Sequence, residues 1–97
     1  MELKAAVCDD SAADRYLVSQ MLRKTAEDMG IPVRIYEYTS GEELMKDIFT
    51  THDILFLDIQ MQGMDGRETA GKFRAQNKNA VLAFVTGVIM PTPEMIR

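Results

Sequence analysis

Residues 53–58 read Asp-Ile-Leu-Phe-Leu-Asp, a continuous apolar run with an acid at each end. A strand that is apolar on both faces is typical of a parallel sheet with helices packed on both sides, because a sheet with one face in water alternates apolar and polar residues. We therefore predict a buried strand over these residues, with the carboxylate of Asp58 at its end.

The segments before and after this run alternate between strands and helices. Leu3–Cys8 is a short apolar strand followed by Asp9 and Asp10. Val33–Tyr38 alternates as a half-exposed edge strand does, and Ala80–Val85 is a fourth strand. Three helices separate the strands: one capped by Ser11 and stopped by Gly30 and Pro32, one opened by a capping box of Ser40 and Glu43, and one from about Arg67 to Gln76.

This order of elements predicts an α/β fold. Strands that alternate with helices form a parallel sheet with right-handed crossovers. One edge-like strand and three apolar strands favour the flavodoxin-like strand order 2-1-3-4, with helices on both faces of the sheet. We expect one domain over residues 1–97, in which residues 87–97 form an irregular tail or the start of a fourth helix.

The apolar periodicity of the helices predicts which of their faces are buried. In the first helix we expect the buried face to repeat at every fourth residue, and in the second we expect apolar residues on one side. The predicted buried residues are Leu17, Met21, Thr25 and Met29 in the first helix, with Leu22 beside them, and Leu44, Ile48 and Phe49 in the second.

Four further residues have expected environments. Tyr36 and Tyr38 should lie exposed on the edge strand, and His52 should be a solvated loop residue. Cys8 should be a small buried apolar residue.

Composition argues against several classes of function. The net charge of −4 disfavours nucleic acid as a direct ligand, because contacts to phosphates need an excess of Lys and Arg. No apolar run approaches the ~20 residues that span a bilayer, and the N-terminus turns acidic too soon for a signal peptide. The single cysteine, Cys8, cannot form an internal disulfide, so we expect a cytoplasmic protein without a membrane partner.

Acidic residues stand at the ends of two predicted strands. Because parallel strands end at the same edge of a sheet, Asp9, Asp10 and Asp58 should meet there, with Thr86 nearby. The winding of the chain reverses between the first and third strands, and ligands bind at such a switch point. Converging carboxylates repel one another unless a cation such as Mg²⁺ neutralises them, and Mg²⁺ commonly binds phosphoryl oxygens as well. Asp58 would then be a nucleophile, and the Thr86 hydroxyl would donate to the phosphoryl group.

The same residues also have purely structural interpretations. Asp9 and Asp10 could serve only to stabilise the positive N-terminus of the following helix. A threonine such as Thr86 is an ordinary residue at the end of a strand. Asp65 and Gly66 are expected as turn and helix-start residues.

Three segments resemble the motifs of response regulator receiver domains. They are Cys8-Asp9-Asp10, residues 56–66 (Phe-Leu-Asp-Ile-Gln-Met-Gln-Gly-Met-Asp-Gly) and residues 84–87 (Phe-Val-Thr-Gly), and the similarity runs through about residue 90. The Cys-Asp-Asp opening and the Phe-Val-Thr-Gly segment are most similar to receivers that carry LytTR-type DNA-binding output domains. This resemblance implies a role in transcription regulation through an output domain outside these residues.

The resemblance also implies a two-component mechanism. Asp58 would accept a phosphoryl group from a phosphohistidine of a sensor histidine kinase. Asp10 and Asp58 would bind Mg²⁺ directly, Asp9 would act mainly through water, and the Gln60 carbonyl would complete the protein ligands. Thr86 would reorient toward the phosphoryl oxygens and signal the phosphorylated state.

Two departures from the family pattern affect these expectations. Gln62 stands where the family usually has proline, which predicts a less rigid loop after Asp58. The family's fifth strand, with its phosphate-pairing lysine, should lie after residue 97. Without it, Val81–Val85 would be an unprotected sheet edge, which predicts a homodimer formed through the fourth strand.

Two other functions compete with the phosphorylated switch. A Mg²⁺-dependent phosphohydrolase would need an acid or base two residues after Asp58, but Gln60 cannot transfer a proton, so we expect no enzyme. A dimerisation or docking module with a receiver-like fold but no phosphoryl chemistry is the second alternative, and the absent lysine keeps it open.

Overall fold

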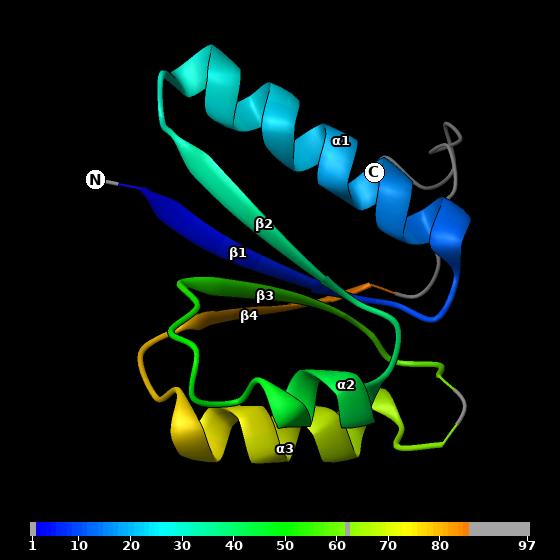
Figure 1. The fold of residues 1–97 in the computed structure, drawn as a ribbon. Helices are drawn as coiled ribbons and strands as arrows, with labels where there is room; N and C mark the ends of the chain where they lie inside the picture. The colour runs from blue at the N-terminus through cyan, green and yellow to red at the C-terminus, as the bar shows by residue number, and fades with distance from the viewer. Residues whose placement is uncertain (1, 62, 86–97) are drawn as a thin grey trace, which may run out of the picture.

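The computed structural model describes residues 2–61 and 63–85. Its strands and helices alternate along the chain, as the sequence predicts (Figure 1). In chain order they are β1 (Leu3–Cys8), α1 (Ala12–Met29), β2 (Val33–Tyr38), α2 (Gly41–Lys46), β3 (Ile54–Asp58), α3 (Gly66–Gln76) and β4 (Val81–Val85).

The strands form a four-stranded parallel sheet in the order β2-β1-β3-β4, which confirms the predicted topology. Helix α1 covers one face of the sheet, and α2 and α3 lie together on the other (Figure 1). The winding reverses between β1 and β3, where Cys8 pairs with Leu57. The carboxyl ends of these two central strands therefore lie next to each other.

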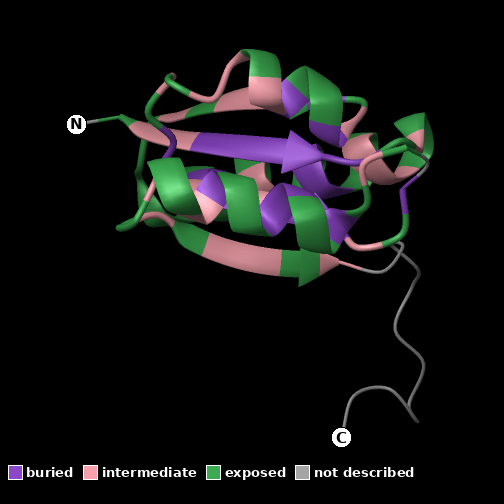
Figure 2. Ribbon diagram, turned by 90° about the horizontal axis from the view of Figure 1, so that it is seen from below, coloured by how far each residue is buried: buried purple, intermediate pink, exposed green. Residues whose placement is uncertain are grey.

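The hydrophobic core lies between the sheet and the helices α2 and α3. Leu44 from α2 and Phe73 from α3 are fully buried against Leu55 and Leu57 of β3. Figure 2 shows that β1 is buried along most of its length, whereas β4 carries only intermediate and exposed residues. Cys8 belongs to this core, as predicted.

Side-chain caps begin each helix. The predicted caps Ser11 and Ser40 accept hydrogen bonds from the backbone N–H groups of Asp14 and Glu43, at 3.3 and 3.0 Å. Asp65 caps α3 in the same way. Gly30 ends α1 in the left-handed conformation with φ 69°, which glycine adopts without a steric penalty.

The predicted buried face of α1 is wrong. Met21 and Met29 are 62% and 66% exposed, and Leu17 and Thr25 are exposed as well. The predicted set is displaced by one residue, about 100° around the helix axis, from the set that faces the sheet. The residues that face the sheet are instead Val18, Ser19 and Ala26, which are buried, and Leu22, which is half-buried.

The second helix and the edge strand also differ from expectation. Helix α2 ends at Lys46, so Ile48 and Phe49 lie beyond it, and Phe49 is 85% exposed. Leu44 is buried as predicted. Tyr38 is buried in the core rather than exposed, because its hydroxyl finds polar partners inside the fold.

Like Tyr38, His52 has polar atoms and is nevertheless buried. It is 3% exposed, not solvated as predicted, and its ring packs against Tyr36, Tyr38 and Phe73. Tyr36 also differs from the prediction, because it is half-buried and packs against the core.

Several predictions concern residues that the structure does not describe. These are Thr86, Gln62 and the predicted tail over residues 87–97. The predicted lack of a fifth strand also lies outside the described residues. Among the residues that are described, no helix is long and apolar enough to cross a membrane.

Candidate metal centre

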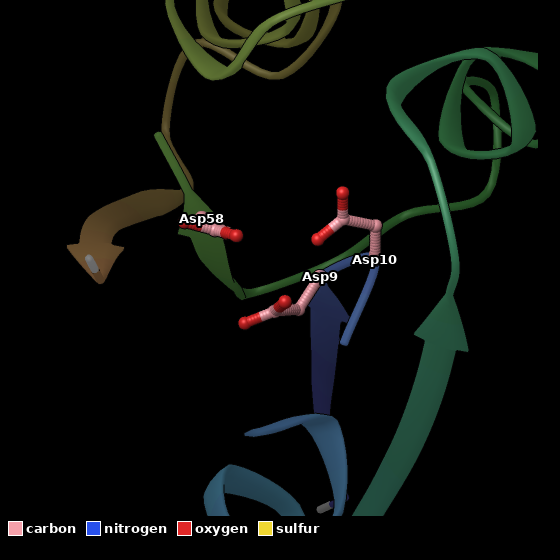
Figure 3. Close-up of side chains that lie close together, drawn as sticks. All are labelled: Asp9, Asp10 and Asp58. Carbon is pink, nitrogen blue, oxygen red and sulfur yellow. The ribbon is translucent and has the colours of Figure 1, made fainter. Parts of the chain in front are cut away.

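Three carboxylates meet at the carboxyl edge of the sheet. Asp9 and Asp10 directly follow β1, and Asp58 is the last residue of β3. One carboxylate oxygen from each residue lies within 4.8 Å of the others. Figure 3 shows the side chains pointing toward one another from the two neighbouring strand ends. The structure thus brings together the acidic residues that the strand pattern places at this edge.

Asp9 is the most buried of the three, with 1% of its surface exposed. Its Oδ1 accepts a hydrogen bond from the Ser11 N–H at 2.9 Å, whereas its buried Oδ2 has no partner among the described residues. Burial raises the pKa of Asp9 above its usual value, and the nearby Asp58 carboxylate acts in the same direction. An orphaned buried carboxylate oxygen is costly, so this position favours a cation or a hydrogen-bond donor.

Arg15 is the basic residue that the structure places beside Asp9. Its guanidinium donates to the Asp9 backbone carbonyl at 2.8 Å and lies 3.7 Å from the Glu37 carboxylate. Arg15 therefore joins the ends of β1 and β2 and holds the backbone of Asp9 in place. This role of Arg15 was not predicted from the sequence, although a basic residue one turn into a helix that follows two acids is a usable signal.

Asp58 is 5% exposed, and its carboxylate is fixed by the loop that follows it. Asp58 Oδ1 accepts a hydrogen bond from the Gln60 N–H at 3.0 Å. Gly66 closes the same loop by donating to the Ile59 carbonyl at 3.0 Å. A Cβ on Gly66 would lie 2.5 Å from the Asp58 carbonyl oxygen, so the backbone approaches too closely there for any larger residue.

The cluster suits a hard divalent cation. Its side-chain donors are all carboxylate oxygens, which Mg²⁺ prefers, and Mg²⁺ is commonly bound by one or two carboxylates plus phosphate oxygens and water. Gln60 lies two residues after Asp58, is exposed, and places its backbone N–H beside the cluster through the bond to Asp58 Oδ1. Thr86 lies outside the described residues.

Comparison with known proteins decides the family. The family model described as the response regulator receiver domain matches residues 5–94. The chain belongs to the response regulator receiver domain family. It is therefore a receiver domain of two-component signalling systems, with the fold that the sequence predicts.

Solved structures agree with this assignment. The response regulator TrrA from Thermotoga maritima, in complex with Mg²⁺-BeF, is 30% identical with a TM-score of 0.75, over 87% of this receiver domain and 69% of that chain. The chemotaxis protein CheY4 from Vibrio cholerae is 27% identical with a TM-score of 0.63, over 97% of this domain and 74% of that chain.

A third structure shares the fold alone. The adenylate cyclase from Rhodopirellula baltica is 23% identical with a TM-score of 0.63, over 89% of this receiver domain. The domain spans 60% of that chain. The search of curated protein sequences found no match to this chain.

Proposed function

We propose that this receiver domain accepts a phosphoryl group on Asp58 in a Mg²⁺-dependent reaction, from a phosphohistidine of a sensor histidine kinase. The observation that carries the proposal is the convergence of Asp9, Asp10 and Asp58, whose oxygens lie within 4.8 Å of one another at the switch point of the sheet. Family membership and the likeness to TrrA in complex with Mg²⁺-BeF support it.

The ligand roles are those that the resemblance to the receiver family implies. Asp10 and Asp58 would bind Mg²⁺ directly, and the Gln60 carbonyl would add a main-chain oxygen. Asp9 would act through a metal-bound water, because its buried Oδ2 lacks a hydrogen-bond donor among the described residues. When bound, Mg²⁺ supplies the positive charge that neutralises the carboxylates and the phosphoryl oxygens.

The transfer itself is an in-line displacement at phosphorus. A carboxylate oxygen of Asp58 forms the new O–P bond while the P–N bond to the donor histidine breaks, and the leaving imidazole nitrogen takes up a proton. The Gln60 N–H holds the Asp58 carboxylate in one rotational position before the reaction. Thr86 would donate its hydroxyl to a phosphoryl oxygen and report the phosphorylated state.

The wider role is that of a signalling switch rather than an enzyme. The motifs around Asp9 and residues 84–87 favour a cytoplasmic regulator of the LytTR type, which would act in transcription through an output domain. DNA binding is not assigned to the receiver domain itself, in keeping with its net charge of −4.

We further propose that the domain forms a homodimer through β4. This strand pairs with β3 on one side, and within the described residues it has no strand neighbour on the other. Val81 and Phe84 are 59% and 48% exposed, and β4 has no charge, proline or glycine to discourage pairing. Sedimentation velocity at high concentration should show a dimer, and a monomer at every concentration would contradict this proposal.

Intact-mass spectrometry after incubation with Mg²⁺ and phosphoramidate tests the phosphoryl transfer. We expect a gain of one phosphoryl group that is abolished by EDTA. No adduct from folded protein would instead favour the docking module without phosphoryl chemistry.

A further inference from the structure

The loop between β3 and α3 carries the backbone of Gln60 and thus adjoins the proposed metal centre. Its first part is anchored beside the site, where Gln60 donates to Asp58 Oδ1 and Ile59 accepts from Gly66. Met61 adds a buried side chain, 9% exposed, whose sulfur lies 3.8 Å from the Cys8 sulfur. These contacts hold the beginning of the loop to the core.

The later part of the loop is held by a different element, the first turn of α2. Glu42 Oε2 accepts a hydrogen bond from the Met64 N–H at 3.2 Å. The two residues are 22 positions apart, so this bond joins segments that are separated along the chain. A carboxylate acceptor makes a stronger bond to a backbone N–H than a neutral one does.

Two glycines allow this close approach. Gly63 has φ 76°, and a Cβ there would lie 2.7 Å from Glu42 Oε2, so the loop backbone passes directly against the carboxylate. A Cβ on Gly41 would lie 2.2 Å from Thr69 Oγ1 and 3.2 Å from the Met64 carbonyl oxygen. The start of α2 is therefore pressed against both the loop and α3, which places Glu42 within reach of Met64.

We infer that Glu42 is a positioning residue for the metal centre, which it reaches through its hydrogen bond to the Met64 backbone. The inference rests on the proposed Mg²⁺ site. Glu42 does not touch Asp58 in this arrangement; it fixes the far part of the loop whose near part presents the Gln60 backbone to the cation. Losing this bond lets the loop sample other conformations, so a cation must order the loop when it binds and binds more weakly.

The test compares Glu42→Ala and Glu42→Gln with Glu27→Ala in the whole receiver domain. Glu27 is an exposed residue of α1, on the opposite face of the sheet from α2, so its variant makes the same charge change on a helix away from the loop. A glutamine side-chain oxygen can still accept from Met64, whereas alanine cannot. The readouts are the Mg²⁺ concentration at half-saturation, from amide chemical shifts, and hydrogen exchange of the Met64 amide.

We expect Glu42→Ala to raise the half-saturating Mg²⁺ concentration roughly fivefold and to speed exchange at Met64. Glu42→Gln should lie between wild type and Glu42→Ala in both, because its neutral oxygen still accepts from Met64, and Glu27→Ala should match wild type. If Glu42 acted only through its charge at the helix N-terminus, Glu42→Gln would behave like Glu42→Ala, which would overturn the inference. Equal half-saturation in wild type and Glu42→Ala would overturn it too.

The wild-type titration separates this inference from the proposed function. If the wild-type domain shows no Mg²⁺ binding at the carboxylates, the metal site itself is wrong, and so is the role of Glu42. If wild type binds Mg²⁺ and Glu42→Ala binds it equally well, the metal site stands and the role of Glu42 alone is refuted.

Discussion

The Tyr38 hydroxyl lies 3.1 Å from Nε2 of His52, and the same hydroxyl donates its proton to the Asp47 carboxylate. Asp47 is held ionised because hydrogen bonds from Thr50 and Tyr38 lower its pKa. Since a hydroxyl has one proton to donate, its oxygen must accept from His52, so Nε2 of His52 carries a proton. His52 Nδ1 is buried and has no partner among the described residues.

This arrangement predicts acid destabilisation through His52. Burial lowers the pKa of His52 below its usual value of 6.5, so the folded protein keeps it neutral while the unfolded chain protonates it. Unfolding then takes up a proton, and the free energy of unfolding should fall by up to ~1.4 kcal/mol per pH unit as pH drops below 6.5.

Urea unfolding of wild type and His52→Gln between pH 7.5 and 5 checks this prediction. Glutamine can still donate to the Tyr38 oxygen but does not titrate. The difference in stability should shift in favour of the variant as pH falls. Parallel pH profiles for the two proteins would show that His52 is not the source.

A second prediction tests the orientation of α1. Val18 is 5% exposed and Met21 is 62% exposed. Val18→Ala should therefore lower the free energy of unfolding by about 1–2 kcal/mol, whereas Met21→Ala should change it by less than about 0.5 kcal/mol. Urea unfolding measures both, and a larger loss for Met21→Ala would restore the helix face that the sequence predicted.

The error in that helix face shows where sequence reasoning reached its limit. Strand order and the meeting of Asp9, Asp10 and Asp58 follow from rules that act on whole elements, because parallel strands share an edge. The rotation of α1 about its own axis follows from no such rule, because the predicted and observed faces are only one residue, about 100°, apart. Leu17, Met21 and Met29 fit a four-residue repeat as well as Val18, Leu22 and Ala26 do, so the pattern alone does not choose between these two faces.

Burial of polar side chains was the second limit. Tyr38 and His52 carry polar atoms and were expected in water, yet both are buried because they pair with each other and with Asp47. Such pairings join β2 to the segment after α2 and depend on three-dimensional packing. The contact of Glu42 with Met64 was not predicted for the same reason.

A third prediction concerns how much the acidic cluster lowers the free energy of unfolding when no metal is bound. Asp9 Oδ2 is buried without a hydrogen-bond partner in the described part of the chain, and burial raises the pKa of this residue. Asp9→Asn keeps the Oδ1 acceptor for Ser11 and removes the charge, so it should stabilise the protein in EDTA by about 1 kcal/mol. Saturating Mg²⁺ should stabilise wild type more than the variant.

Urea unfolding measures the free energy of unfolding of wild type and Asp9→Asn, each in EDTA and in saturating Mg²⁺. A variant that is less stable than wild type in EDTA would show that the Asp9 charge is already compensated within the protein.

Phosphorylation of Asp58 is tested most directly by intact mass after incubation with Mg²⁺ and phosphoramidate, in wild type, Asp58→Asn and Asp53→Asn. Asp53 directly precedes β3, and its carboxylate accepts from the Lys4 N–H at 2.8 Å, so its variant makes the same change at the opposite end of the strand. We predict one phosphoryl adduct in wild type and Asp53→Asn and none in Asp58→Asn. An unchanged adduct in folded Asp58→Asn, or no adduct in wild type, would contradict the role of Asp58 as phosphoacceptor.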